Sequence, residues 1–109
     1  MRAAKILFKN MDAGTLTQYD DGTFTFQYHA SWVEDPTRPP ISLGLPKRYA
    51  PYESEFLFPF FYNMLPEGSN KQVICRLNQI DTDDYFGLLM VTAKNDAIGA
   101  VRVQKINDI

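Results

Sequence analysis

The sequence has little of the chemistry from which most metal and catalytic sites are built. Its 109 residues contain one cysteine, Cys75, and one histidine, His29. A single cysteine cannot form an internal disulfide, and this pair cannot supply the four ligands of a structural zinc site. Any nucleophile–base pair would have to combine these two residues, and this is the one catalytic alternative that the sequence leaves. We therefore predict no metal, no cofactor and no catalytic residue, that is, no enzyme.

Long apolar runs and an excess of positive charge are also missing. Eleven Lys and Arg are balanced by thirteen Asp and Glu, a net charge of −2, and the longest basic run is the pair Lys47–Arg48. No segment approaches the roughly 20 apolar residues of a membrane span. Charges also interrupt the first ten residues too often for a secretion signal. We expect a cytoplasmic protein that binds neither nucleic acid nor a membrane directly.

The composition is that of one folded domain covering residues 1–109. Hydrophobic residues make up 45% of the chain and charged residues 22%, both ordinary for a globular protein. A chain of this length can bury a core without disulfides. Only the aromatic share of 14% is unusual. With no reactive cluster in view, binding another protein is the function that the composition favours.

The first half of the chain is typical of antiparallel strands. Residues 4–9 form a short apolar run, and residues 10–14 are predicted to be a loop. The runs 15–19 and 23–28 flank Asp21-Gly22, a pair that supplies the positive φ angles of a tight hairpin turn. Alternation within the second run places its aromatic residues on one face, which we expect to be the core.

Prolines interrupt the chain after Trp32, where residues 34–40 contain three of them and are predicted to be a surface loop. Residues 41–45 alternate and predict a short strand, followed by a loop over 47–52. Residues 100–104 predict a last strand, after a turn at Asn95-Asp96.

Helical spacing begins in the segment 54–65. One apolar stripe, at i, i+3, i+4, i+7 and i+8, consists of Leu57, Phe60, Phe61, Met64 and Leu65. Because Pro59 cannot sit freely inside a helix, the helix either starts after Ser54 or is kinked. Pro66 and Gly68 are predicted to end it.

Two further helices are predicted after this one. Ser69 and Gln72 have the spacing of a capping box, and Val73, Ile74, Leu77 and Ile80 follow as an apolar stripe. A third helix is predicted to start at Asp81 or Thr82 and to run through Leu89. The expected fold class is α+β, an antiparallel sheet of about five strands with two or three helices on one face.

Two acidic patterns near the third helix favour structure over chemistry. Asp84-Tyr85-Phe86-Gly87 resembles a stretched form of the magnesium motif of kinases, but no phosphate-binding loop or catalytic-loop motif accompanies it. Asp81, Asp83 and Asp84 lack the glycine and glutamate of a calcium loop. We expect these residues to cap a helix whose aromatic residues are core.

The segment 56–65 is the best candidate for an interface. Phe58 and Tyr62 are spaced i, i+4 on a second face, so the predicted helix is apolar nearly all round. Either the helix is central and fully covered, or one aromatic face meets a partner. Trp32 has the same two interpretations. The candidate partner-binding residues are Trp32, Phe58, Phe61, Tyr62, Leu65, Pro66, Glu67, Gly68 and Ser69.

Taken in order, these motifs resemble those of one family. They are Gly14-x-Leu16, Phe24-x-Phe26-x-Tyr28 with Trp32, Pro40-Ile41-Ser42-Leu43-Gly44-Leu45-Pro46, Phe60-Phe61-x-x-x-Leu65-Pro66-Glu67-Gly68, Asp84-x-Phe86-x-Leu88-Leu89, and Asn95-Asp96-x-x-Gly99-Ala100-Val101. The set is similar to the N-terminal module of HipA-type toxin kinases and covers almost the whole chain. In those kinases the module precedes and packs on the kinase core, whose catalytic motifs lie downstream.

The resemblance implies a partner class and a function. The free-standing form of this module is HipS, the small antitoxin of split HipBST toxin–antitoxin systems. HipS neutralises a separate serine/threonine kinase, HipT, and a DNA-binding HipB protein can join the complex. Kinases of the family phosphorylate an aminoacyl-tRNA synthetase. The alternative is that the chain is the excised N-terminal structural or dimerisation module of a fused HipA-type kinase.

One position departs from the family pattern. Relatives often carry a bulky aromatic residue directly after Leu-Pro-Glu-Gly, where this sequence has Ser69. If that aromatic side chain plugs the kinase cleft in some relatives, this chain must inhibit in another way. Holding the small lobe of the kinase in an inactive arrangement is one such way.

Overall fold

The fold is an antiparallel sheet with helices on one face and at both ends. The computed structural model describes residues 1–93 and 100–106. Five strands lie in the order β4-β3-β2-β1-β5, all antiparallel. The strands are β1 Arg2–Phe8, β2 Met11–Gln18, β3 Phe24–Tyr28, β4 Tyr52–Ser54 and β5 Val101–Lys105. The predicted α+β class and five-stranded sheet are confirmed.

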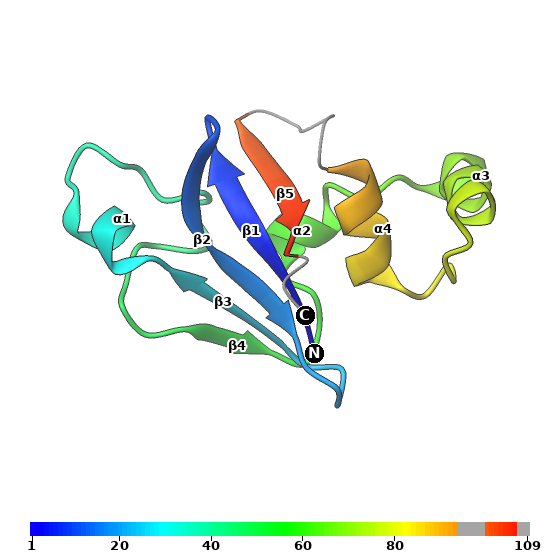
Figure 1. Cartoon of the computed structure of the whole chain (residues 1–109), viewed down its shortest axis with the longest axis horizontal. Helices are drawn as coiled ribbons and strands as arrows, with labels where there is room; N and C mark the ends of the chain where they lie inside the picture. The colour runs from blue at the N-terminus through cyan, green and yellow to red at the C-terminus, as the bar shows by residue number, and fades with distance from the viewer. Residues whose placement is uncertain (94–99, 107–109) are drawn as a thin grey trace.

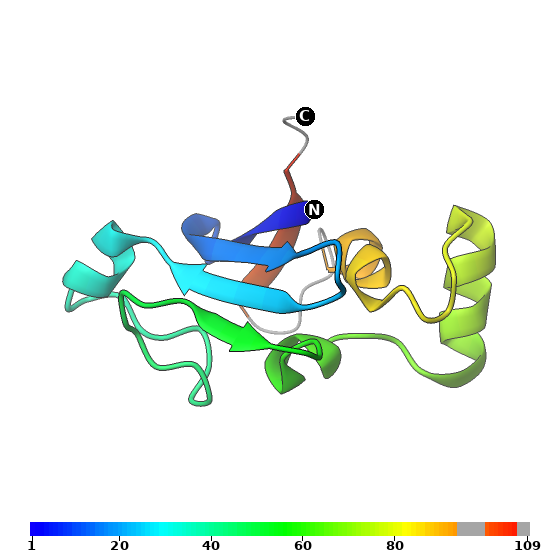
Figure 2. The same cartoon turned by 90° about the horizontal axis from the view of Figure 1, so that it is seen from below.

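Four helices, rather than the predicted two or three, lie within the described residues. They are α1 Ala30–Glu34, α2 Pro59–Tyr62, α3 Gly68–Asn78 and α4 Tyr85–Thr92. Figure 1 shows α1 and α3 at opposite ends of the molecule, and Figure 2 shows α2 beneath the sheet. The helix that was missed, α1, is short and has no side-chain cap, so the usual start signal is absent from the sequence.

Two tight hairpins build the middle of the sheet. Lys9 and Asn10 join β1 to β2 with φ angles of 51° and 67°. The strand β2 already begins at Met11, so the predicted loop over residues 10–14 is wrong. The second hairpin is confirmed. Its turn has Gly22 at φ 89°, and the Asp21 carboxylate accepts a hydrogen bond from the Thr23 amide at 3.0 Å.

Gly14 is required where β2 meets β3. It pairs with Tyr28, and a Cβ atom at this position would lie 2.4 Å from the carbonyl oxygen of Gln27. Any other residue would push the two strands apart, so the glycine of the first motif serves strand packing.

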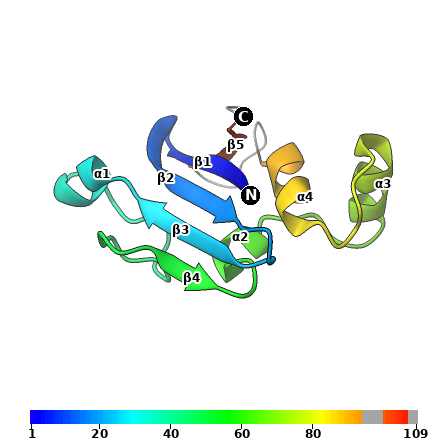
Figure 3. The ribbon, with the colours of Figure 1, turned by 60° about the horizontal axis from the view of Figure 1, so that its bottom comes forward.

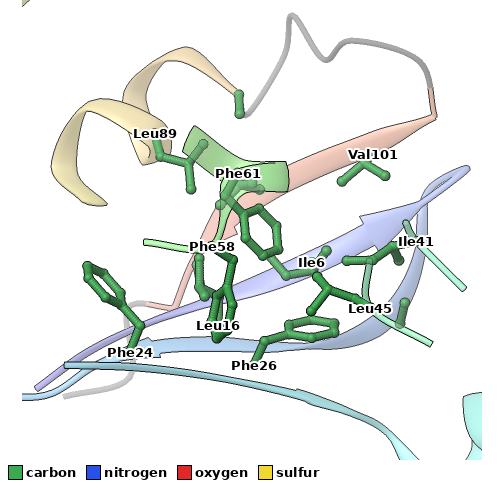
Figure 4. Packing of buried hydrophobic residues seen from close by; sticks show 14 of the residues in the cluster. Ile6, Leu16, Phe24, Phe26, Ile41, Leu45, Phe58, Phe61, Leu89 and Val101 are labelled. Carbon is green, nitrogen blue, oxygen red and sulfur yellow. The ribbon is translucent and has the colours of Figure 1, made fainter. Parts of the chain in front are cut away.

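The core lies between one face of the sheet and the helices α2 and α4. Fully buried side chains come from the sheet and from both helices: Ile6, Leu16, Phe26, Val103, Phe61, Phe86, Leu88 and Leu89. Figure 4 shows Phe61 reaching from α2 toward Phe26, and their ring centroids are 5.9 Å apart. The opposite face is polar, with Lys5 beside Thr15 and Thr15 beside Gln27. The predicted core face of β3 is confirmed.

Trp32 belongs to the core, the first of its two predicted interpretations, and little of its surface is left for a partner. It lies on α1 with 4% of its surface exposed, and its indole donates a hydrogen bond to the Pro39 carbonyl at 2.9 Å. The Lys47 amino group donates to the carbonyls of Trp32, Asp35 and Arg38 at 2.7–3.2 Å. One lysine therefore satisfies the carbonyls at the end of α1 and closes the proline-rich loop on it.

The predicted strand over residues 41–45 is also wrong. Only Ser42 and Leu45 form an isolated bridge, and the segment turns so that Ile41 and Leu45 are buried while Leu43 is exposed. The fourth strand is β4, which includes the end of the predicted loop over 47–52. The alternating apolar residues of the segment 41–45 therefore do not form a strand. They arise because the turn directs Ile41 and Leu45 into the core.

The aromatic segment forms a much shorter helix than predicted. Pro59 is the first residue of α2, so the predicted alternative of a start after Ser54 is confirmed and that of a kink is wrong, and the helix ends at Tyr62. Phe58 lies before the helix and is buried, with 7% of its surface exposed. The apolar side chains around α2 are therefore those of a chain that changes direction, and they do not form one continuous stripe.

The last two helices start in different ways, α3 at a glycine and α4 after a side-chain cap. Gly68 begins α3 at φ 62° after Glu67, so it does not end the preceding helix, and no side-chain cap from Ser69 forms. Asp84 caps α4 by accepting the Gly87 amide at 3.1 Å, which confirms the predicted capping role, although the helix starts after Asp81 and Thr82. The predicted turn at Asn95-Asp96 lies outside the described residues.

Candidate partner-binding site

A small hollow opens where α2, the start of α3 and the start of α4 meet. Its volume is about 240 Å³. Seven residues line it: Tyr62, Leu65, Pro66, Glu67, Gly68, Lys71 and Tyr85. Five of the seven are candidates from the sequence, and they come from one continuous stretch of chain. We call this feature the Tyr62–Tyr85 hollow.

Two tyrosines form its aromatic wall. The rings of Tyr62 and Tyr85 meet edge to face, with centroids 5.6 Å apart and an angle of 88°. Tyr62 keeps 48% of its surface exposed. The Lys71 amino group lies 5.1 Å above the centroid of the Tyr85 ring, a cation–π contact that joins α3 to α4.

The backbone of residues 63–67 sets the shape of the hollow. The Asn63, Met64 and Leu65 amides donate to the carbonyls of Pro59, Phe61 and Tyr62, so the chain keeps turning after α2 ends. The chain then extends at Glu67 and enters α3 through the positive φ angle of Gly68. Leu-Pro-Glu-Gly is thus a connector that presents one wall of the hollow.

The hollow can hold an apolar side chain with a polar edge. Its walls combine aromatic rings, the half-buried Leu65 and Pro66, the exposed carboxylate of Glu67 and the ammonium group of Lys71. Tyrosine rings that are partly exposed are common anchors of protein interfaces, because they offer a large apolar area at little cost in conformational entropy. Such a surface favours recognition of a protein segment over bond-breaking chemistry.

The remaining candidates from the sequence lie elsewhere. Phe61 is fully buried and Phe58 is nearly so, so both pack in the core and leave little surface for a partner. Ser69 is exposed on the first turn of α3 but does not line the hollow.

Sequence reasoning missed Lys71 and Tyr85. Tyr85 appeared only as an expected core residue within the Asp84-Tyr85-Phe86-Gly87 motif, whereas the structure leaves it half-buried beside Tyr62. Since the two tyrosines are 23 positions apart in the sequence, no local pattern could have joined them. The signal for Lys71 was its place on α3, four residues after Glu67.

A second and larger hollow, of about 460 Å³, lies along the β3–β4 edge. It contains none of the candidate residues and is lined by Tyr19, Thr23, Phe24, Thr25, Glu53, Ser54 and Glu55. Its lining includes no cation, and of its two aromatic residues Phe24 is buried in the core. We therefore regard the smaller Tyr62–Tyr85 hollow as the better candidate despite its size.

The two singleton reactive residues do not meet. His29 precedes α1, and its Nε2 lies 2.9 Å from the Asp12 carboxylate, whereas Cys75 is buried on α3 at the other end of the molecule (Figure 1). A catalytic pair of these residues is therefore excluded by geometry. Within residues 1–93 and 100–106, no three His, Cys, Asp or Glu side chains cluster as metal ligands. Nor does any helix in this part of the chain have the length and apolar character needed to cross a membrane.

A family model and a solved structure match most of the chain. The family described as the HipA N-terminal domain matches residues 4–104. A solved structure, the N-terminal domain of the HipA toxin, is similar with a TM-score of 0.73 and 27% sequence identity. The similarity covers 100% of this chain and 96% of that one.

Relatives of two different lengths match the sequence. An uncharacterized protein of Haemophilus influenzae is 30% identical over 105 residues, which cover 96% of this chain and 93% of that protein. Two proteins of Sinorhizobium fredii, named "Putative kinase Y4mE" and "Putative kinase Y4dM", are 30% and 32% identical. Each match covers 82% of this chain but only 21% and 23% of those longer proteins.

Proposed function

Since the chain belongs to the HipA N-terminal domain family, we propose that it is an antitoxin that binds and neutralises a HipT-like serine/threonine toxin kinase. The observation that carries this proposal is the Tyr62–Tyr85 hollow, an aromatic surface next to the Leu-Pro-Glu-Gly connector of the family. In this proposal the chain works in the cytoplasm without a cofactor, as HipS does in split systems. A HipB-like DNA-binding protein is the proposed third member of the complex.

The Haemophilus relative supports this proposal over a purely structural role. That protein is nearly the length of this chain, so the module also occurs as a polypeptide without the remaining four-fifths of the kinase-named relatives. A separate module must hold its kinase through a surface of its own. An exposed aromatic hollow provides such a surface.

A second function is favoured by the Sinorhizobium relatives. In these longer proteins the matching region is about a fifth of the chain, so the module there is one part of a larger polypeptide. The present chain would then be the structural or dimerisation module of a fused HipA-type kinase. The reading frame discriminates between the two: kinase motifs in the same frame favour fusion, and kinase motifs in the adjacent gene favour the antitoxin.

Co-expression with the neighbouring kinase gene tests the antitoxin function. We expect the kinase alone to arrest growth and co-expression of this chain to restore it. In vitro, the purified chain is expected to form a complex with the kinase and to reduce phosphorylation of the synthetase substrate. A kinase that is equally toxic and equally active with and without the chain would refute the proposal.

A matched pair of variants then locates the surface. Tyr85→Ala removes one wall of the hollow, and Tyr49→Ala removes an exposed tyrosine outside it. We expect the first variant to weaken the kinase complex at least tenfold, because aromatic anchors dominate interface energies, and the second to leave it within twofold. Equal affinities of the two variants would place the interface elsewhere.

A further inference from the structure

Helix α3 stands apart from the rest of the fold. Figures 1 and 3 show α4 between α3 and the sheet. Cys75 is its buried residue, and Lys71 contacts Tyr85, so these two side chains mark the face that holds α3 against the body. The apolar stripe predicted for this helix faces solvent at Val73 and Leu77, with 48% and 76% of their surfaces exposed.

The exposed stripe lies on the side of α3 opposite its attachment. Val73 and Leu77 are one turn apart, and Cys75 lies two positions from each, which is about 200° around a helix. The side of α3 that forms the hollow and the side that carries Val73 and Leu77 are therefore separate. Substitutions on the outward side leave the Tyr62–Tyr85 hollow intact.

The charge of α3 differs in sign from that of the whole chain. Residues 68–78 carry Lys71 and Arg76 but no Asp or Glu, whereas the chain has a net charge of −2. Arg76 is exposed and lies about 60° from Val73 around the helix, so it flanks the outward stripe. The nearest acidic residues, Glu67 and Asp81, lie beyond the two ends of the helix.

We propose that α3 is a docking helix whose Val73–Leu77 face seats in an apolar groove rimmed by carboxylates on the kinase. This inference rests on the proposed function and adds a second contact surface to the hollow. Two apolar anchors one turn apart on an exposed helix are the pattern that such grooves recognise. The flanking Arg76 complements an acidic rim, which favours fast association and correct orientation.

A second copy of this chain fits α3 less well. Pairing two α3 helices by this face would bring the Arg76 side chains of both copies close to the same seam, where like charges repel. Two apolar side chains per copy also supply far less than the roughly 1,200–2,000 Å² that a stable interface buries, whereas the proposed kinase complex adds the Tyr62–Tyr85 hollow to the contact. The charge and the area therefore both favour a different, acidic partner.

The test uses the full-length chain with the kinase encoded beside it. The double variant Val73→Ala/Leu77→Ala truncates both anchors. Because alanine has the highest helix propensity, α3 itself is expected to stay helical. We expect the dissociation constant to rise at least tenfold, with an unchanged circular dichroism spectrum. Arg76→Glu is expected to weaken binding about tenfold at low salt and less at high salt, because surface charges are screened. Gln72→Ala, exposed on the same helix but off the stripe, is the matched control and is expected to bind like wild type.

Each outcome decides between the two proposals. Wild-type affinity in both the alanine pair and Arg76→Glu refutes the docking helix while leaving the antitoxin function standing. No wild-type complex at all refutes the antitoxin function and the docking helix together. Light scattering on the chain alone gives a third outcome: a wild-type dimer that Val73→Ala/Leu77→Ala dissociates would assign this face to a second copy and overturn the proposal.

Discussion

Tyr28 shows how one side chain organises a loop that has no regular structure. Its hydroxyl accepts a hydrogen bond from the Ile41 amide at 3.0 Å and donates one to the Leu45 carbonyl. The two backbone groups belong to the turn that was predicted to be a strand. A single buried phenol thus replaces the strand ladder that this segment lacks.

Replacing Tyr28 with phenylalanine is expected to destabilise the fold and to change its response to alkali. The variant leaves the Ile41 amide and the Leu45 carbonyl without a partner, which costs about 1–3 kcal/mol of unfolding free energy. Burial raises the pKa of Tyr28 to about 12, well above the ordinary value of 10.0. Between these two values the unfolded phenol is ionised and the folded one is not, so stability is full below pH 10 and falls as pH rises toward 12.

Urea titrations at several alkaline pH values measure how steeply the unfolding free energy falls with pH, which we call the alkaline slope. The wild-type slope includes a contribution from Tyr49, whose pKa is raised by its hydrogen bond to the Glu34 carboxylate. Tyr49→Phe is therefore the matched control and is expected to keep most of the slope that Tyr28→Phe loses. Equal slopes in both variants would show that burial of Tyr28 does not govern the alkaline response.

At the scale of elements, the start of α4 depends on a side-chain cluster that joins it to the first strand, β1. The Asp84 carboxylate caps the helix and also pairs with Arg2 of β1 through two contacts of 2.6 and 3.0 Å. A Cβ atom at Gly87 would lie 2.4 Å from that carboxylate, so the glycine makes room for the cap. The Arg2 guanidinium also lies 5.0 Å over the Phe86 ring.

Asp84→Asn is expected to destabilise the fold at neutral pH and to lose less stability in acid than wild type. The hydrogen bond from Arg2 is the main reason why the pKa of Asp84 lies below its ordinary value of 3.8. A depressed carboxyl pKa stabilises the fold above pH 3.8, and this contribution is lost as pH falls through the lower folded value. Loss of a charged cap costs about 0.5–2 kcal/mol.

Chemical denaturation at pH 7 and in acid provides the comparison. The difference between wild type and Asp84→Asn is expected to shrink as pH falls below 3.8. Asp21→Asn serves as the control, because it makes the same chemical change in an exposed turn. There the carboxylate accepts hydrogen bonds from Thr23 instead of from an arginine. A difference that stays constant with pH would contradict the Arg2–Asp84 pair as its source.

For the whole molecule, the aromatic residues of the segment 56–65 divide into two groups. Phe58 is buried, and its ring centroid lies 6.4 Å from that of Phe61 in the core. Tyr62 is half exposed and faces Tyr85 across the hollow. The first serves the fold and the second is free to serve a partner.

Separate alanine variants test this division. Phe58→Ala is expected to lower the unfolding free energy by about 3–5 kcal/mol, as truncation of a core phenylalanine does. Tyr62→Ala is expected to cost about 1 kcal/mol or less, the scale of one edge-to-face contact at the surface. Thermal unfolding of the two variants gives the measurement. A loss from Tyr62→Ala as large as that from Phe58→Ala would show that both rings are core.

The sequence alone determined the strands with strong local signals. Alternation in Phe24, Phe26 and Tyr28 gave the core face of β3, and Asp21-Gly22 gave its hairpin, because both depend on neighbouring residues. The strand β5 was found for the same reason, since its residues alternate between buried and exposed. The family motifs, which are fixed in order along the chain, gave the fold class as well.

Only the tertiary structure decided which apolar residues are covered. Trp32 and Phe61 were interface candidates and are buried, while Val73 and Leu77, which belong to a predicted apolar helix stripe, face solvent. Periodicity says which side chains share a face, but the packing of other elements decides whether that face is buried. The Tyr62–Tyr85 hollow likewise exists only because α4 returns beside α2, and that approach depends on contacts between distant parts of the chain.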